Sequence, residues 1–217
     1  MAYIGNIIQC ENNFQKTGIG LGLVKEFLKA DKVTKIIATC RNKEKAEELV
    51  DLESNSRVKV LELDVSKYEN DYKDFIAQVS DELGSDGLNL LINSAGIMGE
   101  TQSLGDLTSE AMIETYKVNL AKPDAGFGCD NAAIIQMSTS GASIAENGLG
   151  ECLFGTKRKM EFLFLSLHPG WVKTDLGGSN AQITVEECVS TMVKTICQLS
   201  DKDHGTFLRY NNTPVAW

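Results

Sequence analysis

The chain has 217 residues, of which 42% are hydrophobic and 24% are charged, as in an ordinary soluble globular protein. A formal net charge of -9 argues against binding to nucleic acid, because a phosphate-binding surface needs clustered Lys and Arg. No apolar run approaches the ~20 residues of a membrane span, so we expect no membrane association.

The length of the chain and its cysteines indicate the number of domains, the chance of a metal site and the cellular compartment. A chain of 217 residues is long for one α/β domain and short for two, so we expect a single domain over residues 1–217. Its six cysteines form no C-x-x-C pair, and with only two histidines a metal site is not expected. The N-terminus lacks the basic segment of a signal peptide, and reduced thiols fit the cytosol, so a cytoplasmic protein is predicted.

Short apolar runs alternate with amphipathic helical stretches along the chain. The predicted strands are 4–8, 35–39, 58–63, 88–92, 132–137, 161–167 and 206–210, the first of which is a poor strand. The predicted helices are 20–29, 42–49, 75–83, 109–120 and one beginning at Thr184. This alternation predicts an α/β fold with a Rossmann-like, doubly wound parallel sheet and right-handed crossovers.

The last predicted helix has the clearest local signals. Thr184 and Glu187 have the spacing of a capping box. Four residues at helical spacing are expected to face the core, namely Val189, Met192, Val193 and Ile196.

Small and polar residues follow several of the predicted strands. Gly18-Ile19-Gly20 opens a helix, where backbone N–H groups face a pyrophosphate in many dinucleotide sites, although glycine turns are common. Asp64 ends the third strand, where it would accept a hydrogen bond from an adenine or be a solvated acid. The buried strand 88–92 runs into Asn93-Ser94-Ala95-Gly96, whose small residues let a ligand lie close to the backbone.

Further along, Asn119 stands near a helix end, Ser138-Thr139-Ser140 follows the fifth strand, and "SLHPGWVKTDLGG" occupies residues 166–178. Together these motifs resemble those of the classical short-chain dehydrogenases/reductases, and within that family the sniffer and C-factor group of small carbonyl reductases. "LLINSAGI" (90–97) resembles the family's Asn-Asn-Ala-Gly strand, with Ser94 in place of the second Asn. The resemblance covers roughly residues 18–120, 132–150 and 162 onward.

The resemblance implies a site for a nicotinamide dinucleotide and a small carbonyl substrate. Its cofactor-binding residues would be Gly18, Ile19 and Gly20 at the pyrophosphate, Asp64 and Val65 at the adenine, Asn93, Ala95 and Gly96 at the adenosine ribose, and Val172 and Thr174 at the nicotinamide. The surviving catalytic candidates would be Asn119, Ser138, Thr139 and Lys157.

Cofactor preference rests on the residues that follow the second strand. Members selective for NAD place an acid there to bind the ribose hydroxyls. This chain reads Thr39-Cys40-Arg41-Asn42, with no acid and one guanidinium suited to a 2′-phosphate. We therefore expect NADP(H) rather than NAD(H), the alternative being that Arg41 is only a solvated residue at a helix start.

The family pattern is interrupted in three places. Aligning Lys157 with the family's lysine puts Leu153 where a tyrosine should donate a proton, which predicts a loss of ~10²–10⁴-fold in rate. The two crossovers that flank the fifth strand are too short for long helices, so we expect two helices on one face to be truncated. Phe14 stands where the first glycine of the turn is expected.

These interruptions are blocks between intact motifs. We hypothesise that whole segments were lost or replaced, as in an alternatively spliced product or an incorrect gene model, which sequencing of the full-length transcript would test. The sequence thus predicts a carbonyl reductase by descent, the alternative being an inactive NADP-binding protein or an incomplete product. The resemblance implies dimers that pack through these helices. Because the helices are predicted to be short, the sequence leaves undecided whether the chain forms a homo-oligomer.

Overall fold

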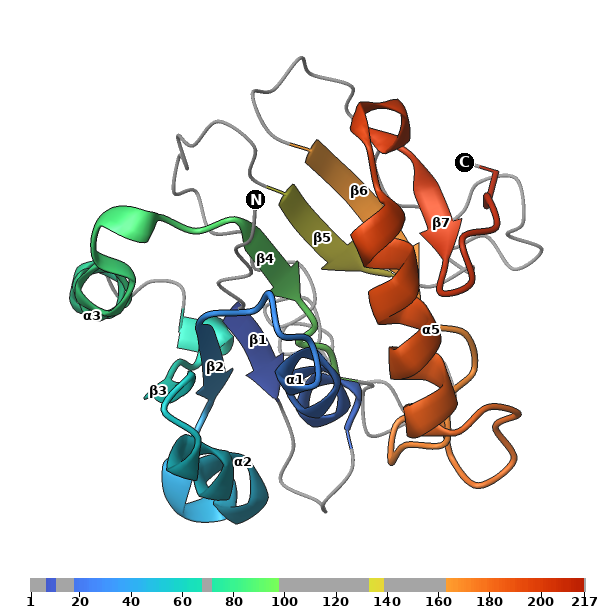
Figure 1. The fold of residues 1–217 in the computed structure, drawn as a ribbon. Helices are drawn as coiled ribbons and strands as arrows, with labels where there is room; N and C mark the ends of the chain where they lie inside the picture. The colour runs from blue at the N-terminus through green and yellow to red at the C-terminus, as the bar shows by residue number, and fades with distance from the viewer. Residues whose placement is uncertain (1–6, 11–17, 68–71, 98–132, 139–162, 217) are drawn as a thin grey trace.

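The computed structural model describes residues 7–10, 18–67, 72–97, 133–138 and 163–216 (Figure 1). Within these residues, seven strands form one sheet in the order β3-β2-β1-β4-β5-β6-β7, and every neighbouring pair is parallel. The strands are β1 (Ile7–Cys10), β2 (Ile36–Cys40), β3 (Val58–Glu62), β4 (Leu90–Asn93), β5 (Ala133–Met137), β6 (Leu163–His168) and β7 (Phe207–Arg209). The predicted Rossmann-like parallel sheet is confirmed.

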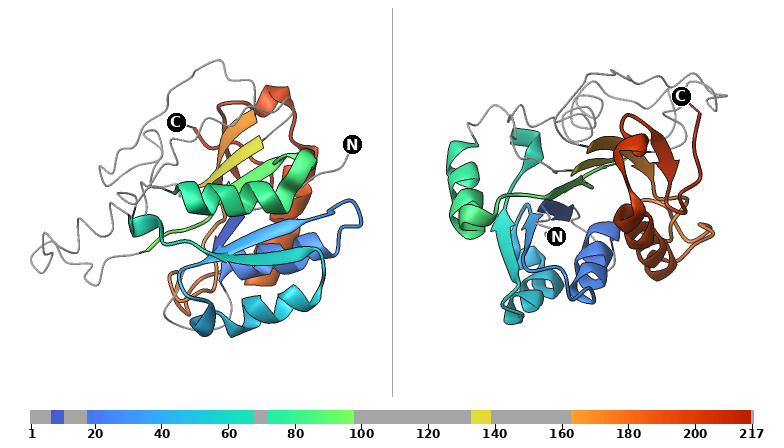
Figure 2. Two further views of the ribbon diagram at one scale, coloured as in Figure 1. Left: turned by 90° about the vertical axis from the view of Figure 1, so that its left-hand side faces the viewer. Right: turned by 45° about the horizontal axis from the view of Figure 1, so that its top comes forward.

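Helices cover both faces of this sheet, as a doubly wound fold requires (Figure 2). The described helices are α1 (Ile19–Leu28), α2 (Glu47–Asp51), α3 (Lys73–Leu83) and α5 (Val185–Gln198). On one face α1, α2 and α5 share a core with the sheet, and on the other α3 packs through Val79 against Ile37, Leu61 and Leu91. No described helix combines the length and the hydrophobicity needed to cross a membrane. The predicted helix 109–120 and the segment around Lys157 lie outside the described residues.

Gly22 explains how closely α1 and α5 approach each other. A methyl group at Gly22 would lie 2.8 Å from Cγ1 of Val185 and 3.1 Å from Cγ1 of Val189. Only a residue without a side chain therefore fits at this contact. The third glycine of Gly18-Ile19-Gly20-Leu21-Gly22 thus serves helix packing.

Local signals set the boundaries of two helical segments. Thr184 Oγ1 accepts a hydrogen bond from Glu187 N at 3.1 Å, and the four predicted core residues of α5 are buried. The helix predicted over 42–49 is wrong as one element. Asn42 caps a short 3-10 helix, η1 (Lys43–Lys45), and Ala46 then breaks the helical backbone before α2 begins.

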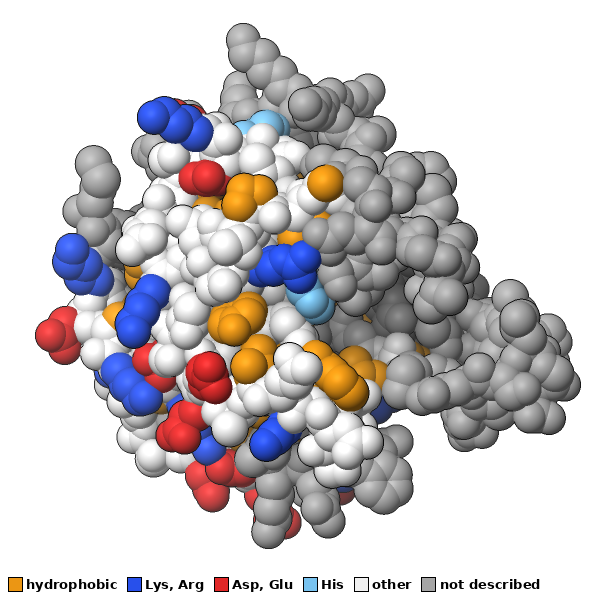
Figure 3. Space-filling model, turned by 90° about the vertical axis from the view of Figure 1, so that its right-hand side faces the viewer, with side chains coloured by type: hydrophobic (Ala, Val, Ile, Leu, Met, Phe, Trp, Pro, Cys, Tyr) orange, Lys and Arg blue, Asp and Glu red, His pale blue; other side chains and the backbone are white. Residues whose placement is uncertain are grey.

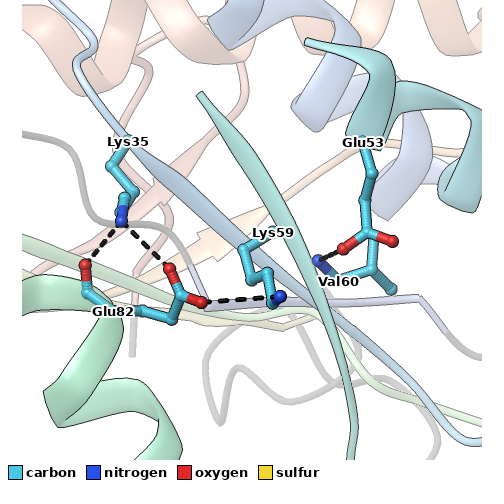
Figure 4. Close-up of polar contacts among 5 residues, drawn as sticks. All are labelled: Lys35, Glu53, Lys59, Val60 and Glu82. Atoms are coloured by element: carbon cyan, nitrogen blue, oxygen red, sulfur yellow. Dashed lines mark hydrogen bonds and ion pairs between the residues drawn. The ribbon is translucent and has the colours of Figure 1, made fainter. Parts of the chain in front are cut away.

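Two glutamates form polar contacts with β3 and with Lys35, which directly precedes β2 (Figure 4). Because β3 is an edge strand, one row of its N–H groups has no neighbouring strand. Glu53 Oε1 accepts one of these bonds, from Val60 N, at 2.8 Å. Near the end of α3, Lys35 Nζ donates to the carbonyl of Glu82 at 2.6 Å and to its carboxylate at 3.0 Å. Lys59 Nζ lies 3.5 Å from the other carboxylate oxygen of Glu82.

We expect Glu82→Gln to destabilise the protein modestly at neutral pH and not at low pH. The hydrogen bond from Lys35, aided by the charges of Lys35 and Lys59 and opposed by burial, lowers the pKa of Glu82 below its ordinary value of 4.5. The stabilisation is therefore complete above pH 4.5 and is lost as the pH falls through the lower pKa of the folded state. Urea unfolding from pH 7 to pH 3 measures it, with Asp81→Asn as the control for loss of one charge. A Glu82→Gln effect that does not change with pH would contradict the assignment.

Arg57 binds the last carbonyl of α1 and two carbonyls of the turn that follows the helix. Its guanidinium donates to Leu28 O at 2.6 Å, to Val33 O at 3.0 Å and to Ala30 O at 3.3 Å. The last carbonyls of a helix have no partner inside the helix and carry partial negative charge. Arg57 therefore joins the end of α1 to the start of β3.

We expect Arg57→Met to lower the free energy of unfolding by about 2–3 kcal/mol, because it removes a charged donor from half-buried carbonyls. Arg57→Lys keeps the charge but not the planar fork, and should lose less. Urea denaturation measures both changes, with the exposed Lys32→Met as the matched control. Equal unfolding midpoints for Arg57→Met and Lys32→Met would show that the cap contributes nothing.

Candidate functional site

The sheet order places a switch point at β1. The chain moves from β1 to β2 and β3, then returns to the other side of β1 as β4. Ile8 of β1 pairs with Ile92 of β4, one residue before Asn93. Ligands of open α/β sheets bind outside the carboxyl ends of the strands at such a point, so the predicted loops lie at the expected edge.

The start of α1 suits a phosphate group. Gly18 precedes the helix in an extended conformation, with φ -80° and ψ 161°, and its carbonyl accepts the first helical bond, from Gly22 N, at 3.1 Å. A methyl group at Gly18 would meet no described atom within 4 Å, so the part of the chain that the structure describes leaves space beside it. The first N–H groups of a helix, here those of Ile19 and Gly20, have no partner inside the helix and can donate to a phosphate.

Arg41 and Asp64 follow the ends of two adjacent strands, because Cys40 of β2 pairs with Glu62 of β3 and Leu63 N donates to Cys40 O at 2.9 Å. Asp64 Oδ1 accepts hydrogen bonds from Ser66 N at 3.0 Å and Ser66 Oγ at 2.6 Å, and Lys67 Nζ lies 3.6 Å from Oδ2. Burial acts to raise the pKa of Asp64, but the bonds from Ser66 and the charges of Lys67 and Arg41 outweigh it and lower the pKa. Asp64 is thus an ionised acceptor at the position predicted for adenine.

Tyr72 also lies at this end of the sheet, and no motif in the sequence points to it. Its hydroxyl donates to Val65 O at 3.4 Å, and burial together with the charge of Asp64 raises its pKa. It lies far from Ser138, the described catalytic candidate after β5, and so does not take the place of the tyrosine that the sequence lacks before Lys157. Four strand intervals separate β3 from β5, roughly 19 Å at about 4.8 Å per interval.

The residues predicted for the adenosine ribose lie at the end of β4, next to the end of β5, where the predicted catalytic residue Ser138 lies. Asn93 ends β4 opposite Gln136 of β5, and Ala95 and Gly96 follow it. Ser138 comes directly after β5, and its N–H donates to Leu167 O of β6 at 2.8 Å. The structure therefore brings Asn93 and Ser138 to the same edge on adjacent strands.

Beyond β6, Val172 is buried and pairs with Ile183 as a single parallel bridge. Thr174 Oγ1 accepts a hydrogen bond from Gly177 N at 3.1 Å. The start of this segment is tied to α5, because Cys188 Sγ donates to Pro169 O at 3.2 Å. Burial, with a contribution from Glu187, raises the pKa of Cys188 to about 12, so this thiol is a structural donor and not a nucleophile.

Three of the predicted catalytic residues lie outside the described residues: Asn119, Thr139 and Lys157. Leu153, which takes the place of the family's tyrosine, also lies outside them. Their roles remain predictions from the sequence. Among the residues that the structure does describe, no group of three or more His, Cys, Asp or Glu side chains could hold a metal ion.

Comparison with known proteins places these features in a family. The model of the family "short chain dehydrogenase" matches residues 15–144, more than half of the chain. Among solved structures, the carbonyl reductase Sniffer of D. melanogaster is 30% identical, with a TM-score of 0.79 over 98% of this chain and 99% of that one. An NADPH-bound carbonyl reductase from chicken fatty liver is 28% identical, with a TM-score of 0.79 over the whole of both chains.

A sequence relative, the C-signal protein of Myxococcus xanthus, is 27% identical over 154 aligned positions, which take up 60% of this chain and 93% of the relative. The alignment is longer than the part of this chain that it covers. The relative therefore contains residues that have no counterpart in this chain. The parallel sheet, the glycine turn at its switch point, the strand-end motifs and these matches agree. The chain belongs to the short-chain dehydrogenase/reductase family, in the group of the Sniffer-type carbonyl reductases.

Proposed function

We propose that this protein is an NADP(H)-dependent oxidoreductase that acts on small carbonyl compounds, with residues 1–217 forming one nucleotide-binding domain. The observation that carries the choice of cofactor is the residue after β2: Arg41 follows this strand, beside the end of β3, and no acid occupies the position that binds the ribose of NAD. The NADPH bound in the chicken carbonyl reductase supports the same choice.

Each part of the cofactor has residues suited to it. The open space at Gly18 and the N–H groups of Ile19 and Gly20 would receive the pyrophosphate. The carboxylate of Asp64 would accept a hydrogen bond from the adenine amino group, next to Val65. The bound cofactor would supply a hydride.

The remaining residues would hold the ribose, the nicotinamide and the substrate. Asn93 ends β4, Ala95 and Gly96 follow it, and all three would border the adenosine ribose, while Val172 and Thr174 would hold the nicotinamide. Ser138 or Thr139 would hold the substrate oxygen, and Asn119 and Lys157 would support proton delivery. Without a tyrosine next to Lys157, water or another donor must protonate the product, so we expect slow turnover.

Thermal melting with and without NADPH or NADH, followed by turnover on a panel of aldehydes and ketones, tests this proposal. We expect NADPH to raise the melting temperature more than NADH does, because a ligand that binds only the folded state stabilises it. We also expect slow, NADPH-dependent loss of aldehyde. A cooperative melt that neither nucleotide shifts would overturn the proposed function.

A further inference from the structure

The segment between β6 and α5 folds back on itself at the predicted nicotinamide end. Val172 and Ile183 form its parallel bridge, and Lys173 N donates to Ile183 O at 2.8 Å. The N–H groups of Gln182 and Ile183 both donate to Trp171 O, at 3.2 and 3.3 Å. These bonds fix the two ends of the segment and leave a tight turn between them.

That turn runs from Thr174 to Gly178. Gly178 N donates to Thr174 O at 2.8 Å, and Thr174 N donates back to Val172 O at 2.8 Å. Gly177 sits against the backbone at the centre, because a methyl group there would lie 2.0 Å from Val172 O. The shape of the turn thus depends on how closely Gly177 approaches Val172.

The side chain of Trp171 crosses this turn from outside. Its indole Nε1 donates to Gly177 O at 2.6 Å, while the residue is 52% exposed. Leu176, on the same turn, is 50% exposed. The face of the molecule that carries α5 and the segment before it shows hydrophobic side chains at several points of its surface (Figure 3). Burial therefore does not account for the position of the indole, and its hydrogen bond does.

We propose that Trp171 is a positioning residue for the nicotinamide half of the cofactor. Its indole N–H holds the carbonyl of Gly177, so that the turn keeps Val172 and Thr174 in the arrangement that the nicotinamide requires. This inference rests on the proposed function. It concerns one half of the cofactor only, because Trp171 follows β6 whereas Arg41 and Asp64 lie at β2 and β3.

Calorimetric titration of NADPH and of 2′-phospho-ADP-ribose, which lacks the nicotinamide, tests the proposal. Trp171→Phe keeps an aromatic ring and removes the donor. We expect it to weaken NADPH binding about three- to tenfold and to leave binding of the fragment unchanged. Leu176→Ala is the matched control on the same turn and should change neither affinity. Gly177→Ala, which distorts the turn from within, should show the same selective loss.

Hydrogen exchange of the ligand-free protein gives a second measurement. The amide of Gly178, bonded to Thr174 O, should exchange faster in Trp171→Phe than in the wild type or in Leu176→Ala. Equal weakening of NADPH and the fragment, or no weakening of either with unchanged exchange, would overturn the inference while leaving the proposed function in place. A wild-type protein that binds neither ligand would overturn both.

Discussion

Arg41→Ala is expected to weaken NADPH binding about 10- to 100-fold and to leave NADH binding nearly unchanged. A charge-assisted hydrogen bond to a phosphate contributes about 1.5–3 kcal/mol, which corresponds to that range of affinity. NADH lacks the 2′-phosphate and would make no such contact. Titration calorimetry or cofactor fluorescence measures both affinities.

The position of Arg41 is the reason to expect so selective an effect. Arg41 follows β2 directly, and its charge contributes to the lowered pKa of Asp64 at the end of β3. Removing the guanidinium should therefore also weaken the electrostatic support of Asp64, an effect common to both cofactors and smaller than the loss of the phosphate contact.

Lys45→Ala provides the matched control, because Lys45 is an exposed cation in the neighbouring η1. It removes the same net charge without removing the group that we assign to the phosphate. Equal losses of NADPH affinity in the two variants would mean that general charge, and not Arg41 itself, favours NADPH. Equal losses of NADPH and NADH in Arg41→Ala would contradict the assignment to the 2′-phosphate.

The sequence predicted well those helices and strands whose burial requires apolar residues at regular positions. The apolar run that became β4 lies buried between two layers of helices, and the core face of α5 follows directly from its helical spacing. Thr184 marked the start of α5 because its cap is a bond to a residue three positions away. Local chemistry of this kind is visible in a sequence.

What the sequence could not show depends on contacts between distant residues or on backbone geometry. The residues after Asn42 are good helix formers, yet Ala46 takes φ -109° and ψ 41° and interrupts them. Arg57 donates to carbonyls 24 to 29 residues earlier in the chain, and the sequence around Arg57 contains no pattern that predicts these bonds. Gly22 lies two residues after the glycine turn, yet it contacts α5, more than 160 residues away.

The candidate site also has one part that the sequence predicts and one part that only the structure reveals. Its strand-end motifs could be assigned to one edge because parallel strands carry their carboxyl ends to the same side. The bond from Trp171 to Gly177 O could not be predicted, since it joins a side chain to a carbonyl whose direction is set by the turn. The order of motifs therefore predicts where the site lies, and the structure adds the bond from Trp171 that we propose positions its nicotinamide end.

Leu153→Tyr is expected to raise kcat for aldehyde reduction by about 10²–10⁴-fold, the usual contribution of a general acid. The substitution restores a phenol four residues before Lys157, the spacing at which a lysine one helical turn on lowers the pKa of the phenol. NADPH affinity should stay the same, because the cofactor residues of β1 to β4 are untouched. Steady-state rates of NADPH consumption measure the gain.

Two variants separate the proton donor from the aromatic ring. Leu153→Phe adds the ring without the hydroxyl and should leave kcat unchanged. Adding Lys157→Met to Leu153→Tyr should remove most of the gain, because the phenol would lose the cation that lowers its pKa. Equal rates for Leu153→Tyr and Leu153→Phe would show that a missing phenol is not what limits this chain. In that case we would attribute slow turnover to the short crossovers that the sequence predicts around the fifth strand, since a phenol needs a supporting helix to reach the substrate oxygen.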